Sequence, residues 1–260
     1  MKRLITNADD FGFASDVNSG IVHAHSHGVL TSATLMATGD AFGDAVRLAE
    51  ETPSLDIGVH LVLVQGRSLV TGELFPESPG KLLTDLARGR LHVYAELRAQ
   101  VEKVISAGIK PTHLDSHKHT HLVPAIFRTV VRLAREFKIP YVRLPLDASI
   151  PFAGLPCAAA ARFYRSVARQ SGVRMTDHFL GFRLTGSLTE ATFAAAISKL
   201  PAGTTEFMCH PGYLGPELAR AQTRLKASRL REVEALTSPR IRDLLDAEAI
   251  LLGSFRRESE

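Results

Sequence analysis

The sequence predicts an α/β fold, a distorted (β/α) TIM-like barrel with seven or eight mostly parallel strands in a single domain over residues 1–260. Short β-branched runs alternate with longer segments of helical periodicity, a pattern typical of βα units around a parallel sheet. A length of 260 residues is common for one such barrel. Polar residues also follow several of the expected strands, where the loops of a barrel converge.

Strands are expected where a short apolar or β-branched run lies between turn-forming residues. These runs cover 4–8, 31–37, 56–62, 113–121 (a strand plus a loop), 141–144, 178–182, 205–209 and 250–255. Helices are expected where apolar residues recur with a period of about 3.6 residues. These segments cover 15–28, 41–51, 97–107, 124–137, 158–169, 190–199, 217–236 and 239–247. The Gly-, Pro- and polar-rich stretch 68–89 predicts a long loop excursion over one face.

The charge pattern argues against nucleic-acid binding. The formal net charge is only +4, and much of the basic excess lies in the C-terminal third. There, Arg220, Arg224, Lys226, Arg229 and Arg231 alternate with apolar residues at helical spacing, which is typical of the solvated face of a helix. No nucleic-acid-binding motif accompanies these charges, and no aromatic residues lie among them.

The sequence has no apolar run of the length that a membrane span requires, and no signal-peptide core follows Met1. We therefore expect a cytoplasmic protein. Two cysteines, Cys157 and Cys209, make no disulfide framework and are expected to be buried or idle thiols. A Cys209–His210 nucleophile pair is disfavoured because neighbours in a strand point to opposite faces.

Between Pro111 and Pro124 the chain concentrates imidazoles and one carboxylate in alternating positions: His113, Asp115, His117, His119 and His121. In an extended segment all five would line one face. Imidazole with carboxylate is a common ligand set for divalent metals. A helical arrangement would pair histidines four residues apart instead, but the bracketing prolines favour a strand and a loop.

The segment Asn-Ala-Asp-Asp-Phe-Gly at 7–12 places two adjacent carboxylates where a strand gives way to a Gly-containing turn. Two crowded carboxylates resist simultaneous ionisation unless a cation is present. One interpretation is therefore a division of roles, in which one carboxylate binds a metal and the other stays free as a base. The alternative is an exposed acidic turn, which Asp residues often form.

Other single polar residues occupy equivalent positions at strand ends. His60 lies in the apolar run Gly-Val-His-Leu, Arg143 in the strand that begins at 141, and His210 directly after the strand that ends at 209. A lone histidine in an apolar run is more often a satisfied core residue than a ligand, but the position of His60 at the rim of a barrel leaves both interpretations open.

Four ordered motifs together resemble the YdjC-like carbohydrate deacetylases, which include chitooligosaccharide deacetylases. They are Asn-Ala-Asp-Asp-Phe-Gly at 7–12, Gly-Val-His-Leu at 58–61, Thr-His-Leu-Asp-Ser-His-Lys-His-Thr-His at 112–121 and Cys-His-Pro-Gly at 209–212. The stretches Leu-Val-Leu-Val-Gln-Gly-Arg-Ser at 61–68 and Val-Arg-Leu-Pro-Leu-Asp at 142–147 resemble the hopanoid-biosynthesis-associated members more closely.

This resemblance implies a barrel, often a homodimer, that removes the N-acetyl group from an N-acetylglucosamine-type sugar. It also implies that one divalent cation, Zn²⁺ or Mg²⁺, is held by Asp10, His60 and His117. Asp9 would be the general base and His210 the general acid. Arg143 would orient Asp9 or contact the substrate, and Asp115 would accept a hydrogen bond from a ligand imidazole.

The substrate could be an acetylated chitooligosaccharide or an N-acetylglucosaminyl hopanoid. An apolar lip formed by Leu69, Val70, Leu74 and Phe75 would suit such a glycolipid and a peripheral contact with a membrane surface. Two other functions stay open. One is a metal-dependent sugar-binding protein without catalysis, and the other is a metallophosphoesterase, which would normally carry more carboxylates for two metals.

Overall fold

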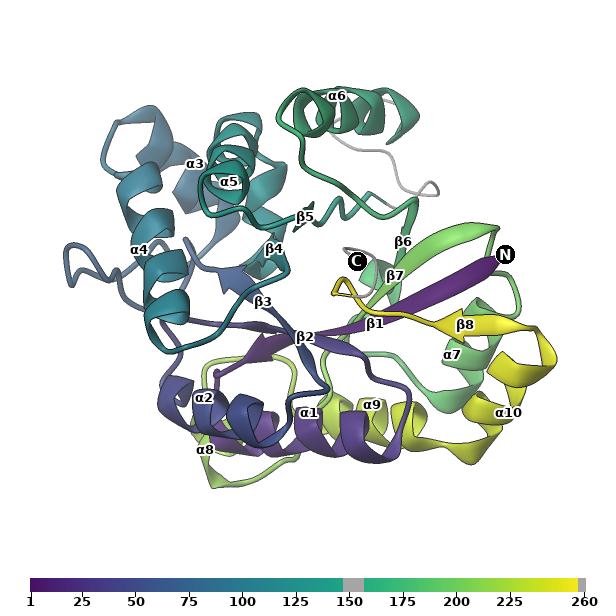
Figure 1. Cartoon of the computed structure of the whole chain (residues 1–260). Helices are drawn as coiled ribbons and strands as arrows, with labels where there is room; N and C mark the ends of the chain where they lie inside the picture. The colour runs from purple at the N-terminus through teal and green to yellow at the C-terminus, as the bar shows by residue number, and fades with distance from the viewer. Residues whose placement is uncertain (147–156, 257–260) are drawn as a thin grey trace.

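A computed structural model describes residues 1–146 and 157–256 of the chain. These residues form one curled sheet of parallel strands with helices around its outside (Figure 1). The sheet order is β5-β4-β3-β2-β1-β7-β6, and β8 pairs with β1. The strands are β1 Lys2–Phe11, β2 Ser32–Leu35, β3 Asp56–Leu61, β4 His113–Ser116, β5 Tyr141–Val142, β6 His178–Leu180, β7 Gly203–Cys209 and β8 Ile250–Leu252.

The helices connect successive strands, as the alternating sequence pattern predicts. They are α1 Ser15–His27, α2 Phe42–Glu51, α3 Pro79–Ala87, α4 Val93–Ser106, α5 Pro124–Glu136, α6 Cys157–Gln170, α7 Glu190–Ile197, α8 Pro216–Arg220, α9 Ala227–Thr237 and α10 Pro239–Ala247. Their apolar faces close the core against the sheet, for example through Ile126, Phe127 and Val130 of α5, none of which is more than 1% exposed. No helix in the described part of the chain is both long and apolar enough to span a bilayer.

Strand β1 is the centre of the sheet. One of its edges pairs with β7 from Lys2 to Ala8. The opposite edge pairs first with β8, over Lys2 to Leu4, and then with β2 from Asn7 onward. Because β1 is ten residues long and buried along most of its length, its carboxyl end carries the next residues directly into the rim of the sheet.

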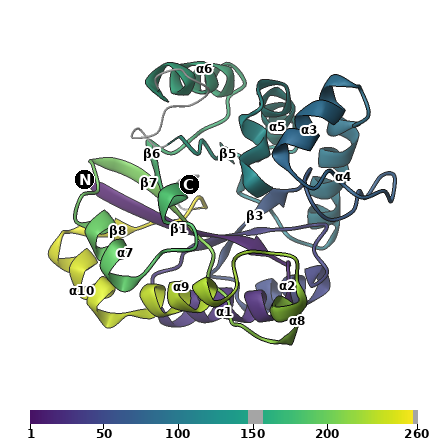
Figure 2. The same cartoon turned by 180° about the vertical axis from the view of Figure 1, so that it is seen from behind.

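The two ends of the sheet approach each other without a continuous ladder. A single parallel bridge joins Tyr141 of β5 to Arg174, which precedes β6, and the Val142 amide donates to the Arg174 carbonyl over 3.0 Å. This contact lies on the side of the sheet away from α1 and α9, and Figure 2 shows the same region from behind. The prediction of a distorted, TIM-like parallel barrel is confirmed.

The prediction of a strand plus a loop over the histidine-rich segment is confirmed, but its alternating residues do not line one face, so that part of the prediction is wrong. Strand β4 ends at Ser116, and residues His117–Leu122 form a 3₁₀ segment in which Lys118 and His119 both have φ of 52°. Two consecutive left-handed residues end the strand and reverse the chain. The Ser116 hydroxyl accepts the His121 amide over 3.0 Å, which stabilises the reversal.

Two further boundaries differ from the sequence-based expectation. The expected helix over 217–236 is two helices, α8 and α9, separated by residues 221–226, so its basic residues do not share one face. The expected loop over 68–89 contains α3, which begins after Ser78 because the Ser78 hydroxyl accepts the Lys81 amide and Pro79 suits the first turn.

Candidate metal centre and active site

A cavity of about 670 Å³ opens at the carboxyl ends of the strands. Five of the six site residues that the sequence predicts line it: Asp9, Asp10, His60, His117 and His210. They come from β1, β3, the segment after β4 and the end of β7, so the parallel sheet brings together residues up to 201 positions apart. The sixth, Arg143, lies buried beneath the cavity and does not line it.

Three of these residues could hold one cation. One ligand atom each from Asp10, His60 and His117 lies within 4.8 Å of the others. Asp10 Oδ1 is 3.5 Å from His60 Nε2 and 3.2 Å from His117 Nδ1. Among the described residues, this buried oxygen has no hydrogen-bond partner. A buried carboxylate oxygen facing two imidazole nitrogens fits a divalent cation, which would satisfy all three atoms.

The backbone of β1 explains how two neighbouring carboxylates reach the same cavity. Asp10 has φ of 68°, a left-handed conformation that Asp tolerates better than most residues. The following turn is held by the Phe13 amide, which donates to the Asp10 carbonyl, and by the Gly12 amide, which donates to Asn18 Oδ1 over 2.6 Å. The turn at Asp10 therefore brings both carboxylates to one site, and the exposed acidic turn is excluded because Asp9 and Asp10 are buried.

Asp115 orients the His60 ring. The His60 Nδ1 donates to Asp115 Oδ1 over 2.7 Å, and Thr34 Oγ1 donates to Asp115 Oδ2 over 3.1 Å. The hydrogen bond at Nδ1 leaves the His60 Nε2 atom directed at Asp10. A carboxylate behind a ligand imidazole sets its tautomer and raises its basicity in many metal sites.

Arg143 holds Asp9 through a two-point contact. Its Nη1 and Nη2 atoms donate to the two Asp9 oxygens over 2.8 Å and 2.7 Å, and its Nε donates to Glu206 Oε1 over 2.6 Å. Nη1 also lies 2.6 Å from Asp115 Oδ2. Burial raises the pKa of Asp9, but the Arg143 guanidinium, together with the imidazoles of His60 and His210, outweighs burial and holds that pKa well below its usual range. Arg143 therefore orients an ionised Asp9 from below the cavity, and the alternative of substrate contact receives no support from this geometry.

His210 also lines the cavity, together with His60 and His117. Its backbone amide donates to Glu232 Oε2 of α9 over 2.5 Å. Its Nδ1 atom is buried without a hydrogen-bond partner among the described residues. Burial lowers the pKa of His210 to about 4, although Asp9 and Asp10 act in the opposite direction. Cys209, its neighbour, is buried and donates to the Asn7 carbonyl, so it takes no part in the cavity, and the Cys157 side chain lies outside the described residues.

The remaining histidines of the 113–121 segment lie outside the candidate cation group. His113 is fully buried, stacks on Phe255 with ring centroids 3.9 Å apart and contacts Asn7 Oδ1 through Nε2. His121 is fully buried, and its ring nitrogens contact Ser116 Oγ and the Arg143 carbonyl. His119 lines the cavity near Phe182. His117 is thus the one histidine of the segment that joins the candidate cation group.

Sequence reasoning missed the buried charges that support the site. Arg229 was expected on a solvated helix face, yet it is 1% exposed and contacts Asp10. Its position four residues from both Leu225 and Val233, on the apolar side of the helix, is a signal that could have placed it inside. Glu206 and Glu232 were also missed, although a lone Glu before Phe207 in an apolar strand is unusual for a structural residue.

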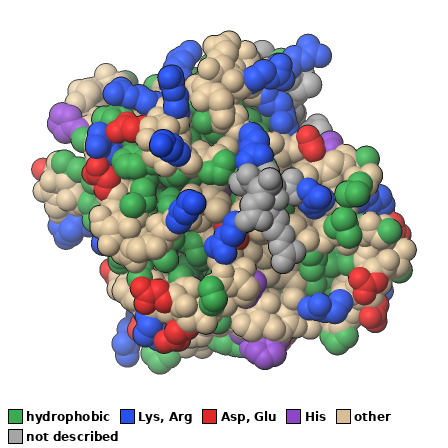
Figure 3. Space-filling model, in the orientation of Figure 1, with side chains coloured by type: hydrophobic (Ala, Val, Ile, Leu, Met, Phe, Trp, Pro, Cys, Tyr) green, Lys and Arg blue, Asp and Glu red, His purple; other side chains and the backbone are tan. Residues whose placement is uncertain are grey.

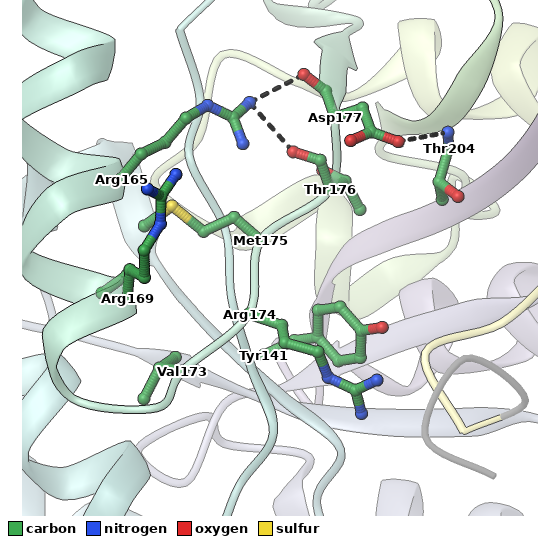
Figure 4. A pocket seen from close by; sticks show the side chains of 10 residues that line it. Tyr141, Arg165, Arg169, Val173, Arg174, Met175, Thr176, Asp177 and Thr204 are labelled. Atoms are coloured by element: carbon green, nitrogen blue, oxygen red, sulfur yellow. Dashed lines mark hydrogen bonds between the residues drawn. The ribbon is translucent and has the colours of Figure 1, made fainter.

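A second cavity, of about 350 Å³, lies near the amino ends of β5, β6 and β7, away from the candidate site (Figure 4). It is lined by Arg165, Arg169, Arg174, Asp177 and others. Figure 4 shows Arg165 turned toward the backbone, where it donates to the carbonyls of Thr176 and Asp177.

A parallel α/β barrel with an Asp-His-His group, a spare carboxylate and an opposing imidazole at its carboxyl rim has the arrangement of a barrel hydrolase. The chain belongs to the YdjC-like protein family, whose model matches residues 3–247.

Two curated relatives span almost the whole chain. This chain is 36% identical to a carbohydrate deacetylase of Brevibacillus brevis, and the match covers 97% of this chain and 98% of that protein. It is 32% identical to a chitooligosaccharide deacetylase of Yersinia enterocolitica, over 98% of both chains. Among solved structures, it is similar to an Enterococcus faecalis V583 protein provisionally named for cellobiose-phosphate cleavage, with a TM-score of 0.81, 26% identity and 98% coverage of each chain.

Proposed function

We propose that this protein hydrolyses the N-acetyl group of an acetylated amino sugar, with one divalent cation held by Asp10, His60 and His117. The observation that carries the proposal is the division of roles between Asp9 and Asp10. Asp10 presents an unpartnered oxygen to two imidazoles, whereas Asp9 is held on Arg143 beside them and is not part of that group. The names of the relatives, carbohydrate and chitooligosaccharide deacetylase, support the same reaction class.

The chain's own residues supply the proton transfers. A bound divalent cation would provide Lewis-acid activation of the acetyl carbonyl and of water. Asp9 takes one proton from the attacking water, and the water oxygen forms the new bond to the acetyl carbon. Because burial lowers the pKa of His210 to about 4, its imidazole starts neutral. The proton that Asp9 takes from water therefore passes to His210 and from there to the sugar nitrogen as the C–N bond breaks, because an amide nitrogen leaves poorly without one. The products are acetate and a free amine.

The shape of the rim supports a substrate of more than one sugar unit. Another lobe, of about 520 Å³, adjoins the rim cavity of about 670 Å³. Gln65, His117 and Gln222 line both. Phe13 lies in the wall of this lobe and offers an aromatic face to a sugar ring. Because His117 stands between the two lobes, a neighbouring sugar can occupy the second lobe while the acetyl group lies beside Asp9.

A glycolipid such as an N-acetylglucosaminyl hopanoid is the alternative to a chitooligosaccharide as the substrate. Leu69, Val70 and Leu74 are 37%, 49% and 73% exposed, as an apolar lip requires, but Phe75 is buried. Val70 and Leu74 line a small separate cavity and neither lobe of the rim. The chitooligosaccharide interpretation therefore has the stronger structural support. A homodimer, a cytoplasmic location and contact with a membrane surface stay predictions from the sequence.

A two-metal phosphoesterase is less well supported. The other candidate ligand group, Asp9, His60 and Asp115, shares His60 with the first, and both of its carboxylates already contact Arg143. The two imidazoles of the first group favour Zn²⁺ over Mg²⁺.

Acetate release measured by mass spectrometry tests the proposal. The protein is incubated with diacetylchitobiose or with an acetylated glucosaminyl glycolipid, after chelation and again after Zn²⁺ or Mg²⁺ is restored. We expect acetate release that depends on the metal and is faster with diacetylchitobiose. Metal binding without release of acetate from either substrate would favour a sugar-binding protein and refute the proposed reaction.

A further inference from the structure

Arg229 contacts the back of the candidate metal site. This α9 side chain is 1% exposed, and its Nη2 atom lies 2.5 Å from Asp10 Oδ2. Its Nε donates to the Leu225 carbonyl over 3.2 Å, and its Nη1 donates to the His210 carbonyl over 3.4 Å. The guanidinium carbon also lies 5.9 Å from the centre of the Phe13 ring. These contacts hold the guanidinium in one orientation, and each of its nitrogens has a partner.

The helix that carries Arg229 is itself held against the rim. Glu232, one turn further along α9, accepts the His210 amide, and the Gly212 amide donates to the Arg229 carbonyl over 3.3 Å. A Cβ atom on Gly212 would lie 3.1 Å from the Arg229 side chain, so this close approach favours glycine. The backbone that carries the Arg229 guanidinium is therefore fixed against the rim, unlike the backbone of a mobile surface helix.

The two oxygens of Asp10 have different surroundings as a result. Oδ2 accepts Arg229, while Oδ1 faces His60 Nε2 and His117 Nδ1 without a hydrogen-bond partner of its own. A carboxylate can bind a cation through one oxygen or through both. Here the Arg229 guanidinium occupies Asp10 Oδ2, so binding of a cation through both oxygens is blocked.

We propose that Arg229 is a positioning residue that restricts Asp10 to binding the cation through Oδ1 alone. The inference rests on the proposed function in one respect, that Asp10, His60 and His117 form the cation site. A one-oxygen contact keeps coordination positions open for water and the acetyl carbonyl, which a two-oxygen contact would reduce. Arg229 also offsets the unfavourable burial of the Asp10 charge.

Zn²⁺ binding to the metal-free, full-length protein tests this role, by competition with a chromogenic chelator. In Arg229→Met the Asp10 carboxylate loses its anchor, and we expect Zn²⁺ affinity to fall about 10- to 100-fold, as for other outer partners of metal ligands. If Arg229 acted only as a nearby positive charge that repels the cation, its removal would tighten binding instead. Affinity equal to or greater than that of the wild type would therefore overturn the proposal.

Two further variants make the result decisive. Arg229→Lys keeps the charge but loses the planar fork, and we expect it to bind Zn²⁺ at least about tenfold more weakly than the wild type. It also decides the question if Arg229→Met does not fold, because wild-type affinity in Arg229→Lys would refute positioning. Arg231→Met is the matched control, since Arg231 is exposed on the same helix and contacts only the Gly186 carbonyl among the described residues.

Crystal structures of the zinc-loaded wild type and of a folded Arg229→Met add a readout of geometry. We expect one Asp10 oxygen within bonding distance of zinc in the wild type and both oxygens in the variant. Binding through one Asp10 oxygen in both proteins would contradict the proposal. None of these measurements uses a substrate, so a wild type that binds Zn²⁺ but releases no acetate would refute the proposed function and leave the role of Arg229 intact.

Discussion

The two ends of the same sheet use charged residues in opposite ways. At the amino end, Arg165 donates to main-chain carbonyls, Asp177 accepts the Thr204 amide, and Arg174 stacks over Tyr141 (Figure 4). Figure 3 shows other Lys and Arg side chains spread over the surface in the region of α5 and α6. These groups hold loops in place or remain in solvent.

At the carboxyl end, charged side chains are buried and paired with one another, yet some polar atoms have no hydrogen bond among the described residues. Asp9, Asp115 and Glu206 all contact the Arg143 guanidinium. Within the described residues, Asp10 Oδ1 and His210 Nδ1 are buried without a hydrogen-bond partner, and Asp10 Oδ1 faces the two imidazoles of the cation group. Unsatisfied buried groups are costly, so a fold retains several of them together where a ligand or a reaction uses them. Such atoms also occur elsewhere, as at Thr205 Oγ1 in β7, so the comparison teaches that they indicate the functional end where several of them line one cavity.

The largest effect is expected from His117→Ala. This change removes one of two imidazoles from the candidate cation group, and we expect both Zn²⁺ binding and acetate release to be lost. Isothermal titration with Zn²⁺ and the acetate assay measure the two losses. Retention of either at the wild-type level would show that the rim does not bind a cation through His117.

Asp9→Asn should separate binding from catalysis. The amide cannot accept the water proton, so we expect turnover to fall about 100- to 10,000-fold, the usual contribution of a general base. Zn²⁺ affinity should stay close to that of the wild type because Asp9 is outside the cation group. Near-normal turnover in this variant would contradict the role of base.

Two fully buried histidines outside the cation group, His113 and His121, should make the protein sensitive to acid. Burial lowers the pKa of His121 to about 3 and that of His113 well below its usual range. The unfolded chain takes up these protons below pH about 6.5 whereas the folded protein does not, so stability is lost as the pH falls from there toward 3. The loss is about 1.4 kcal/mol per pH unit for each histidine.

His121→Gln should remove one such contribution and flatten the pH dependence. Urea unfolding of the metal-free wild type and variant at pH 7 and pH 5 measures the difference. The variant will be less stable at pH 7 because the contacts with Ser116 and Arg143 are altered. An equal dependence on pH in the two proteins would show that His121 is not buried in its neutral form.

The smallest effect is expected at the amino end. Arg169→Met, in the wall of that cavity, should leave acetate release and Zn²⁺ affinity unchanged, because the residue lies away from the rim. A clear loss of turnover in this folded variant would break the distinction between the two ends of the sheet.

Much of the architecture follows from local patterns. Alternation of apolar runs with helical periodicity places nearly every strand, and Pro124 and Pro239 begin helices as expected for the fixed φ of proline. Boundaries fail where the backbone takes a left-handed turn. The bracketing prolines predicted a loop after this strand, but Lys118 and His119 are not glycines, so no residue type indicates at which position the strand ends.

The sequence by itself determined the βα order, the strand-end positions of Asp9, Asp10, His60 and His210, and the chemistry that these side chains offer. The resemblance to the YdjC-like family implied that His117 is the ligand and that Arg143 orients Asp9 or contacts the substrate. Only the tertiary structure decided where the neighbouring histidines lie, that Arg143 is buried beneath the cavity, and that Arg229 enters the core from a distant helix. Strand periodicity is a local property of the chain. The pairing of buried charges depends on contacts between segments up to 219 residues apart, which no local pattern encodes.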